Sequence, residues 1–187
     1  MNPTVVVILV AAIVLAGITI LALQYLRTRR LRERFGPEYT RAVREAGDRK
    51  SAESKLQRLE KRVERLRIRA IEPADRERFL RSWRCVQTRF VDDPRSALTE
   101  ADDILREVMS ARGYPVSDFE SRAEDISVDH PRMVEHYRVG HEIVLRHDRG
   151  LASTEDMRQA MIHYRTLFDE LVEHPMQTET VRSGRSA

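Results

Sequence analysis

An uncharged apolar stretch near the start of the chain is the feature that most constrains its fold. Residues 5–23 are 19 residues without a charge, and only Gly17 and Thr19 interrupt their run of Val, Ile, Leu and Ala. As an α-helix this stretch is about 28 Å long, close to the ~30 Å hydrocarbon core of a bilayer. The sequence therefore predicts a single-pass protein in which residues 1–26 form the transmembrane anchor.

Five arginines follow the apolar stretch within eight positions: Arg27, Arg29, Arg30, Arg32 and Arg34. Positive charge directly after an apolar segment opposes its transfer across a membrane and keeps that end inside the cell. We therefore expect a short N-terminus outside, a cytoplasmic C-terminal part, and localisation to the inner (plasma) membrane. A cleaved leader on an exported domain is the alternative, but a leader starts with basic residues and has a shorter apolar core.

Charge divides the rest of the chain into a basic and an acidic part, although the net charge of the protein is only +3. Residues 27–70 hold 16 basic and 7 acidic side chains, whereas residues 71–173 hold 15 basic and 22 acidic ones. Because phosphate contacts dominate nucleic-acid affinity, the acidic body argues against nucleic acid as a partner. The basic part instead favours anionic lipid headgroups, since each basic side chain near the membrane surface contributes about 1 kcal/mol.

Within the basic part, residues 49–67 have the pattern of a helical stalk. Apolar side chains recur at spacings of four and three residues, at Ala52, Leu56, Leu59, Val63 and Leu66. Such spacing is the seam of a coiled coil, but it extends over only about two heptads. Two interpretations stay open: a weak homodimer through residues 52–66, or an amphipathic helix whose apolar stripe packs on the protein's own body.

The acidic part, residues 71–173, predicts a compact helical bundle followed by a disordered polar tail over residues 174–187. Helix starts are indicated at Pro73, Pro94, Pro131 and Ser153 or Thr154, and no segment alternates as a strand does. A further short helix is expected to open with a capping box of Ser117 and Glu120. The predicted fold class is all-α: an N-terminal transmembrane helix, a basic helical stalk and a compact cytoplasmic helical bundle.

Few residue patterns point to catalysis. His141 and His147 are six residues apart, whereas a helical zinc-protease pair needs a spacing of four so that both rings share one face. Cys85 is the single cysteine, so no disulfide can form within the chain, as suits the cytoplasm. We therefore expect no enzyme, no catalytic residues, no cofactor and no metal.

The leading hypothesis is a membrane-tethered cytoplasmic interaction or scaffold module with a protein partner. Its candidate epitope is the connector, residues 111–131, which places two prolines, a glycine and alternating charges between regular helices. Rigidly supported loops often carry recognition, although the same charges could simply fix the connector in place. The candidate interaction residues are Arg112, Tyr114, Asp118, Arg122, Asp125, Asp129 and His130.

A small-molecule-binding or catalytic helical domain is the alternative function. Its pocket would lie between the last two long helices, around Tyr137, His141 and Tyr164. In the first of these helices, the expected inward positions are Val134, Tyr137, His141 and Val144.

The connector and the segments after it also carry a resemblance. The strings RGYP, DFE, DISVDHP, YRVGHEI and STEDMRQAMIHYRTLF resemble a family of small bacterial single-pass membrane-anchored helical proteins. The resemblance covers most of the chain after the anchor, and it implies a bacterial origin and one membrane anchor. It implies no activity, so no catalytic residue can be carried over.

Overall fold

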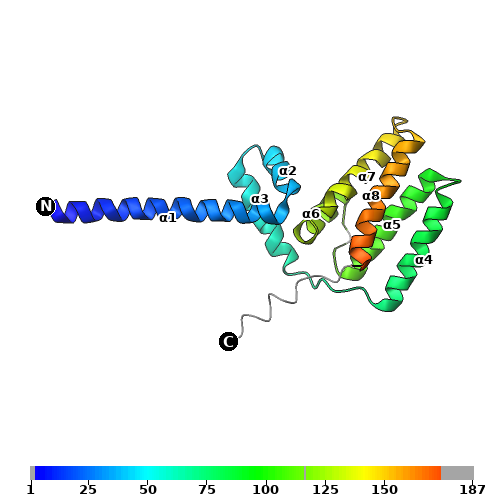
Figure 1. The fold of residues 1–187 in the computed structure, drawn as a ribbon, viewed down its shortest axis with the longest axis horizontal. Coiled ribbons are helices and arrows are strands. Elements are labelled where there is room, and N and C mark those ends of the chain that lie inside the picture. The colour runs from blue at the N-terminus through cyan, green and yellow to red at the C-terminus, as the bar shows by residue number, and fades with distance from the viewer. Residues whose placement is uncertain (1–2, 116, 174–187) are drawn as a thin grey trace. The chain divides into compact units, whose positions relative to one another are not determined.

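The computed structural model describes residues 3–115 and 117–173, and every regular element within them is an α-helix (Figure 1). In chain order these are α1 (Pro3–Phe35), α2 (Pro37–Ala46), α3 (Arg49–Val63), α4 (Pro73–Arg89), α5 (Pro94–Arg112), α6 (Phe119–Asp129), α7 (Met133–Asp148) and α8 (Thr154–Glu173). The predicted all-α fold with one apolar N-terminal helix is confirmed. The predicted disordered tail, residues 174–187, lies outside the described residues.

The chain divides into two compact units, Met1–Gln57 and Arg58–Ala187, called here the N-terminal and C-terminal units. The division falls inside α3. The boundaries expected from hydropathy and charge, after residues 26, 70 and 173, stay predictions.

α1 carries the apolar stretch into the arginine run without a break. It is 33 residues long, and in the described part of the chain it is the helix long and apolar enough to cross a membrane. A signal sequence near an N-terminus can pass the same test of length and apolar composition. Its large apolar side chains from Ile13 to Leu26 are exposed, as expected of a helix whose surroundings are lipid.

Glycine and proline set the ends of the helices in the N-terminal unit. α1 stops before Gly36, whose φ is +50°, and Pro37 opens α2 because its missing N–H needs no helical partner. Gly47 caps α2 in the left-handed conformation, and its N–H donates to the carbonyl of Val43 over 3.1 Å.

α3 is shorter than the predicted stalk. It ends at Val63, and Leu66 lies half-buried in the turn that follows. Beyond this turn the backbone N–H of Arg69 donates to the carbonyl of Arg112 over 2.9 Å, at the end of α5. The last carbonyls of a helix lack intrahelical partners, so this pairing favours an extended chain over further helix.

The apolar stripe of α3 is covered within a single chain. Ala52, Leu56, Leu59 and Val63 are all buried. A coiled-coil seam awaiting a second chain would be exposed in the monomer. The homodimer and the amphipathic helix that packs on the protein's own body both stay predictions.

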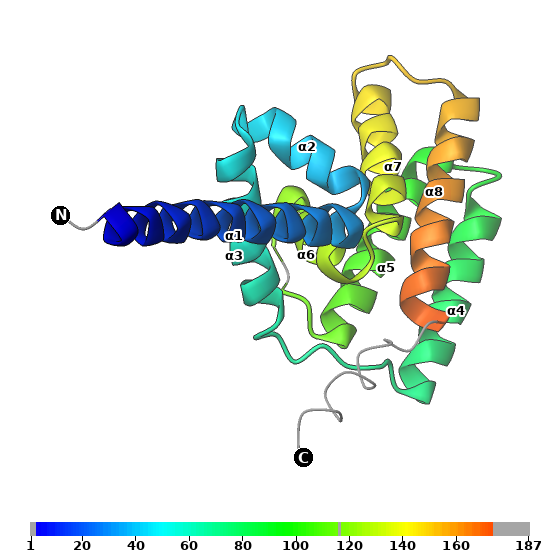
Figure 2. The same cartoon turned by 60° about the vertical axis from the view of Figure 1, so that its left-hand side comes forward.

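α4, α5, α7 and α8 lie side by side as a bundle in the C-terminal unit (Figures 1 and 2). α4 runs antiparallel to α5 and α7 antiparallel to α8, whereas the neighbouring α5 and α8 run parallel. α8 packs against both α7 and α5, α5 packs against α4, and the short α6 packs against α7. The α4–α5 and α7–α8 turns share one end of this bundle, where Arg95 pairs with Asp148 at 3.1 Å. Four long helices and one short one are those that the sequence predicted.

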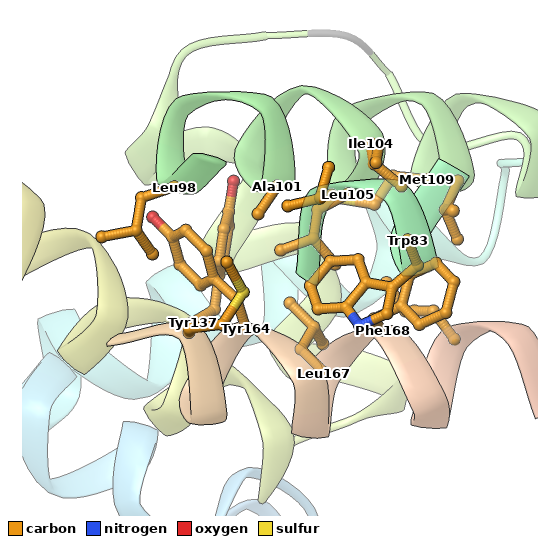
Figure 3. Close-up of a cluster of buried hydrophobic side chains, with 14 of the residues drawn as sticks. Trp83, Leu98, Ala101, Ile104, Leu105, Met109, Tyr137, Tyr164, Leu167 and Phe168 are labelled. Carbon is orange, nitrogen blue, oxygen red and sulfur yellow. The ribbon is translucent and has the colours of Figure 1, made fainter. Parts of the chain in front are cut away.

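The core of the bundle is built from large side chains of all four long helices (Figure 3). Trp83 of α4 stacks on Phe168 of α8, with ring centroids 4.4 Å apart and planes inclined by 15°. Tyr137 and Tyr164 fill the space between α7 and α8, with centroids 6.0 Å apart. Each fully buried side chain of this size contributes about 1.5–3 kcal/mol, so the C-terminal unit is stabilised by a core of its own.

The inward face of α7 differs from the predicted one. Val134 and Tyr137 are buried as expected, but the next buried positions are Gly140 and Ile143, while His141 and Val144 are only half-buried. Gly140 has no side chain, so a hydropathy pattern gives it no weight. Its bare backbone nevertheless faces α8 and sets the orientation of α7.

The predicted cap of α6 is wrong by one residue. Asp118, not Ser117, accepts a hydrogen bond at Oδ1 from the N–H of Ser121, over 3.1 Å. A carboxylate caps as well as a hydroxyl does and also interacts favourably with the helix dipole. The carbonyl of Ser117 is meanwhile occupied by the guanidinium of Arg122.

Candidate functional site

Near the beginning of the connector, Gly113 forms a turn that only glycine permits. Its φ is +95°, and a Cβ on this residue would lie 2.6 Å from the carbonyl oxygen of Arg67. Neither backbone segment can retreat, because the adjacent Arg69 and Arg112 are joined by a backbone hydrogen bond. The chain that follows α3 is therefore fixed against the beginning of the connector.

Arg112 is the most deeply buried charged side chain of the connector, with 1% of its surface exposed. Its Nη1 donates to the carbonyl of Leu171 over 2.7 Å, in the last turn of α8. That carbonyl has no intrahelical partner, and a cation is favourable at the negative end of the helix dipole. Arg112 thus joins the end of α5 to the end of α8.

Beside Arg112, two further predicted residues bind carboxylates. The hydroxyl of Tyr114 donates to Asp129 Oδ2 over 2.9 Å, and Nδ1 of His130 lies 3.0 Å from Glu170 Oε1. A carboxylate can only accept, so Nδ1 of the neutral ring carries the proton. Burial lowers the pKa of His130, and the hydrogen bond to Glu170 opposes this shift.

Nε2 of His130 is buried and has no hydrogen-bond partner among the described residues. A proton added there would place a charge in a site that offers it no acceptor, next to the guanidinium of Arg112. Arg112, Tyr114, Asp129 and His130, together with Glu170, are called the α6–α8 cluster below. It contains four of the seven predicted interaction residues.

Arg122 belongs to a different set of contacts. Its Nε donates to the hydroxyl oxygen of Tyr137 over 3.1 Å, and this hydroxyl donates to Asp102 Oδ1 over 3.1 Å. Nη2 of Arg122 lies 3.7 Å from Asp102 Oδ2. Burial raises the pKa of Tyr137, and the charge of Asp102 raises it further. These three residues connect α5, α6 and α7.

Asp118 and Asp125 complete the predicted set, and neither joins the other residues. Asp118 is the exposed cap of α6. Asp125 is buried, and Nε of Arg62 donates to its Oδ1 over 3.0 Å. The structure thus divides the seven residues among the α6–α8 cluster, the Arg122 contacts, a helix cap and one ion pair. Most of their polar groups are used in holding the connector in place.

The five predicted membrane-proximal arginines all lie within α1, over about two helical turns from Arg27 to Arg34, and their environments differ. Arg29 pairs with Glu33 at 2.8 Å, and Arg27 contacts the side-chain oxygen of Gln57. The guanidinium of Arg32 lies over the ring of Tyr39, 5.3 Å from its centroid. Arg30 is exposed and Arg34 is half-buried.

Glu53 of α3 organises the polar contacts of the N-terminal unit, and the sequence did not single it out. It accepts hydrogen bonds from Thr28 (2.8 Å), Tyr39 (2.9 Å) and Nε of Arg49 (2.9 Å). Burial acts to raise the pKa of Glu53, but hydrogen bonds from Arg49, Thr28 and Tyr39 outweigh it and lower the pKa. The sequence signal for this cluster is the i, i+4 spacing of Arg49 and Glu53, which predicts their ion pair but not the contacts with Thr28 and Tyr39.

A contact between two histidines was also missed by the sequence. Nδ1 of His136 on α7 lies 2.8 Å from Nδ1 of His163 on α8. Burial lowers the pKa of His163, and a positive charge on His136 would lower it further. Within residues 3–115 and 117–173, no three His, Cys, Asp or Glu side chains are placed to hold a metal ion together.

The residues of the alternative pocket are partly brought together. Tyr137 and Tyr164 are fully buried in the core, and the hydroxyl of Tyr164 has no hydrogen-bond partner among the described residues. His141 lies on the flank of α7, where its ring stacks on Phe119 at a centroid distance of 3.6 Å. The surface depressions of the bundle lie elsewhere, for example beside Arg89 and Glu100, or beside Arg78 and Arg106.

Comparison of the chain with models of protein families, with curated proteins and with solved structures finds no match in any of the three.

Proposed function

We propose that this protein is a single-pass membrane-tethered module whose helical bundle binds a protein partner in the cytoplasm. The observation that carries the proposal is the continuity of α1, which runs as one helix from the apolar stretch through Arg34. An apolar span that leads directly into a cluster of arginines favours retention of the arginine side in the cytoplasm. Folded units that follow such a span are held at the membrane surface.

The C-terminal unit has properties that suit a protein-binding domain. It has its own core. Its connector is joined to the bundle by the hydrogen bonds of the α6–α8 cluster and by the Arg122 contacts. Pro115 and Asp118 are exposed above these buried groups. A loop fixed in one conformation loses little entropy when it binds, so it suits recognition.

A homodimer through residues 52–66 would be a second kind of partner contact. It would require the apolar stripe of α3 to leave its buried position, which costs the burial energy of Leu56, Leu59 and Val63. We therefore place the interaction surface on the connector and not on α3.

The binding proposal is tested by site-specific photocrosslinking in native membranes. A photoreactive amino acid replaces Pro115 in the connector of the full chain, and a matched variant carries it at Val91, which is 81% exposed at the opposite end of the bundle. We expect a discrete crosslinked protein with the Pro115 variant and none with the Val91 variant. Equal adducts at both positions, or none at either, would contradict a connector epitope.

The alternative, a small-molecule or catalytic pocket, gains no support from the positions of its residues. Tyr137 and Tyr164 are packed in the core, and His141 faces Phe119. A ligand between α7 and α8 would have to displace Tyr164 from its contact with Gly140.

A further inference from the structure

We propose that a depression in the N-terminal unit binds the phosphate group of an anionic ligand, supplied at the membrane surface by a phospholipid headgroup. The inference rests on the membrane anchoring of the proposed function and adds one defined site to it. The depression has a volume of about 380 Å³ and is lined by Arg32, Gly36, Tyr39, Thr40, Val43 and Arg49. These residues come from α1, α2 and the start of α3, all within the same compact unit.

Arg32 supplies a positive charge that the protein itself does not neutralise. Other arginines of this unit face carboxylates: Arg29 pairs with Glu33, Arg41 with Glu45, and Arg49 with Glu53. In the described part of the chain Arg32 has no such pair, and its guanidinium lies over the ring of Tyr39 instead. Stacking on an aromatic ring orients the guanidinium while leaving its N–H groups available for an anion.

The Tyr39 ring is itself held in place, which makes the position of Arg32 reproducible. Tyr39 is buried, and its hydroxyl donates to Glu53 over 2.9 Å. Arg49 binds the same carboxylate through Nε and contacts Thr28 through Nη2, so other N–H groups of its guanidinium remain. Glu53 cancels one of the two arginine charges, so the depression keeps a net positive charge.

The start of α2 adds a second source of positive potential. Gly36 precedes the helix and provides no side-chain cap. Pro37 has no N–H, and the N–H of Tyr39 donates to the carbonyl of Gly36 over 3.2 Å, so the start of α2 contributes mainly its helix dipole, which favours an anion. The exposed side chain of Thr40, one turn into α2, adds a hydroxyl donor at the rim. A Cβ-free Gly36 leaves open space, with no atom within 4 Å of the position a Cβ would take.

The depression also lies at a suitable depth. Arg32 follows Arg27, the first charged residue after the apolar stretch, by five positions, or about 7.5 Å along the helix. The headgroup layer on each side of a bilayer is about 5–8 Å thick. Arg32 is therefore expected at the outer edge of this layer, within reach of a lipid phosphate.

Native mass spectrometry of the full chain in detergent tests the site. Phosphatidylglycerol or phosphatidylcholine is added to the wild-type protein, to Arg32→Gln and to Arg29→Gln, a control that removes the same charge from the same helix outside the depression. We expect one retained phosphatidylglycerol per chain, reduced about tenfold in Arg32→Gln because a charge-assisted contact is lost, and nearly unchanged in Arg29→Gln. Equal losses in both variants, or no loss in either, would overturn the site.

Inorganic phosphate distinguishes the source of the ligand. When the wild-type chain is added, the ³¹P NMR line of inorganic phosphate should broaden little. Phosphate alone should bind weakly, because it lacks the glycerol and acyl chains that help to retain a phospholipid. Broadening that depends on Arg32, without lipid retention, would support the phosphate site and overturn the lipid as its source. Carbonate extraction of membranes distinguishes a failure of the anchor from a failure of the phosphate site. If carbonate extracts the wild-type chain from the membrane, the anchor is contradicted. If the Arg32→Gln chain stays in the membrane but no longer retains the lipid, the site is supported.

Discussion

Gly140 of α7 lies so close to Tyr164 of α8 that a Cβ on it would be 2.6 Å from Cε1 of the tyrosine ring. The ring cannot easily move away, because Tyr164 is fully buried beside Tyr137 in the core (Figure 3). The carbonyl oxygen of Ala160 would lie 3.4 Å from the same Cβ. The approach of α7 to α8 is thus set by the absence of a side chain at position 140.

The substitution Gly140→Ala should destabilise the bundle. Overpacking in a close-packed core costs about 1–3 kcal/mol, while alanine gains up to about 1 kcal/mol of helix propensity over glycine. We expect a net loss of about 1–2 kcal/mol in the free energy of unfolding, measured by urea denaturation. A double-mutant cycle with Tyr164→Ala provides the control, since Gly140→Ala should be neutral or stabilising once the ring is absent. The same loss in both backgrounds would contradict the packing described.

The stability of the bundle should fall as the pH drops below about 6.5, the ordinary pKa of histidine. Burial lowers the pKa values of His130, His141 and His163 in the folded protein. The unfolded chain therefore binds more protons in this range, and the free energy of unfolding rises with pH. Burial and the charge of Arg112 lower the pKa of His130, whereas Glu170 and Asp129 act to raise it.

His130→Asn isolates one part of this pH dependence. Asparagine keeps an N–H near the position of Nδ1, so the hydrogen bond to Glu170 can persist while the titrating ring is lost. We expect a shallower fall in the urea midpoint between about pH 7.5 and pH 5.5 than in the wild type. His147→Asn, at the other end of α7, is the matched control. An unchanged slope in His130→Asn would show that His130 is not a source of the acid sensitivity.

Removing Arg62 should expose the cost of burying the carboxylate of Asp125. Burial raises the pKa of Asp125, and the hydrogen bond from Arg62 counteracts this. Arg62 is half-exposed, so we expect Arg62→Met to lower the free energy of unfolding by about 1–3 kcal/mol at neutral pH, below the full cost of a buried ion.

The loss in Arg62→Met should shrink as the pH falls. An acid whose folded pKa lies above its unfolded pKa binds more protons in the folded state, so its unfavourable effect is relieved by acid. Adding Asp125→Asn should recover part of the stability at neutral pH, because a neutral amide replaces the unpaired charge. A loss that grows in acid, or no recovery in the double variant, would contradict the buried ion pair.

Local signals predicted the ends of the helices well, because glycine and proline act through their own backbone. Gly36, Gly47 and Gly113 lie at helix ends with positive φ, the helices expected at Pro73 and Pro94 start there, and the one expected at Pro131 starts two residues later at Met133. The cap of α6 was misplaced because Ser117 and Asp118 are adjacent and both can accept a hydrogen bond. The face of α7 was misjudged because a glycine contributes nothing to a hydropathy pattern.

The candidate sites depended on contacts that no local pattern reports. Arg112 and Arg122 both lie in the connector, yet one binds a carbonyl of α8 and the other a tyrosine of α7. The cluster around Glu53 joins residues of three helices, and the pair of His136 and His163 joins two. Such proximity follows from the packing of helices, which a single sequence does not determine.

Labelling of Cys85 tests whether a single-pass anchor holds the helical bundle in the cytoplasm. Cys85 is the only cysteine of the chain and its side chain is exposed on α4, so a membrane-impermeant maleimide can modify one site only. A Thr4→Cys variant in a Cys85→Ser background reports on the other side of the span. With intact cells we predict labelling at position 4 but not at Cys85, and labelling of Cys85 once the membrane is permeabilised. Labelling of Cys85 in intact cells would contradict the account.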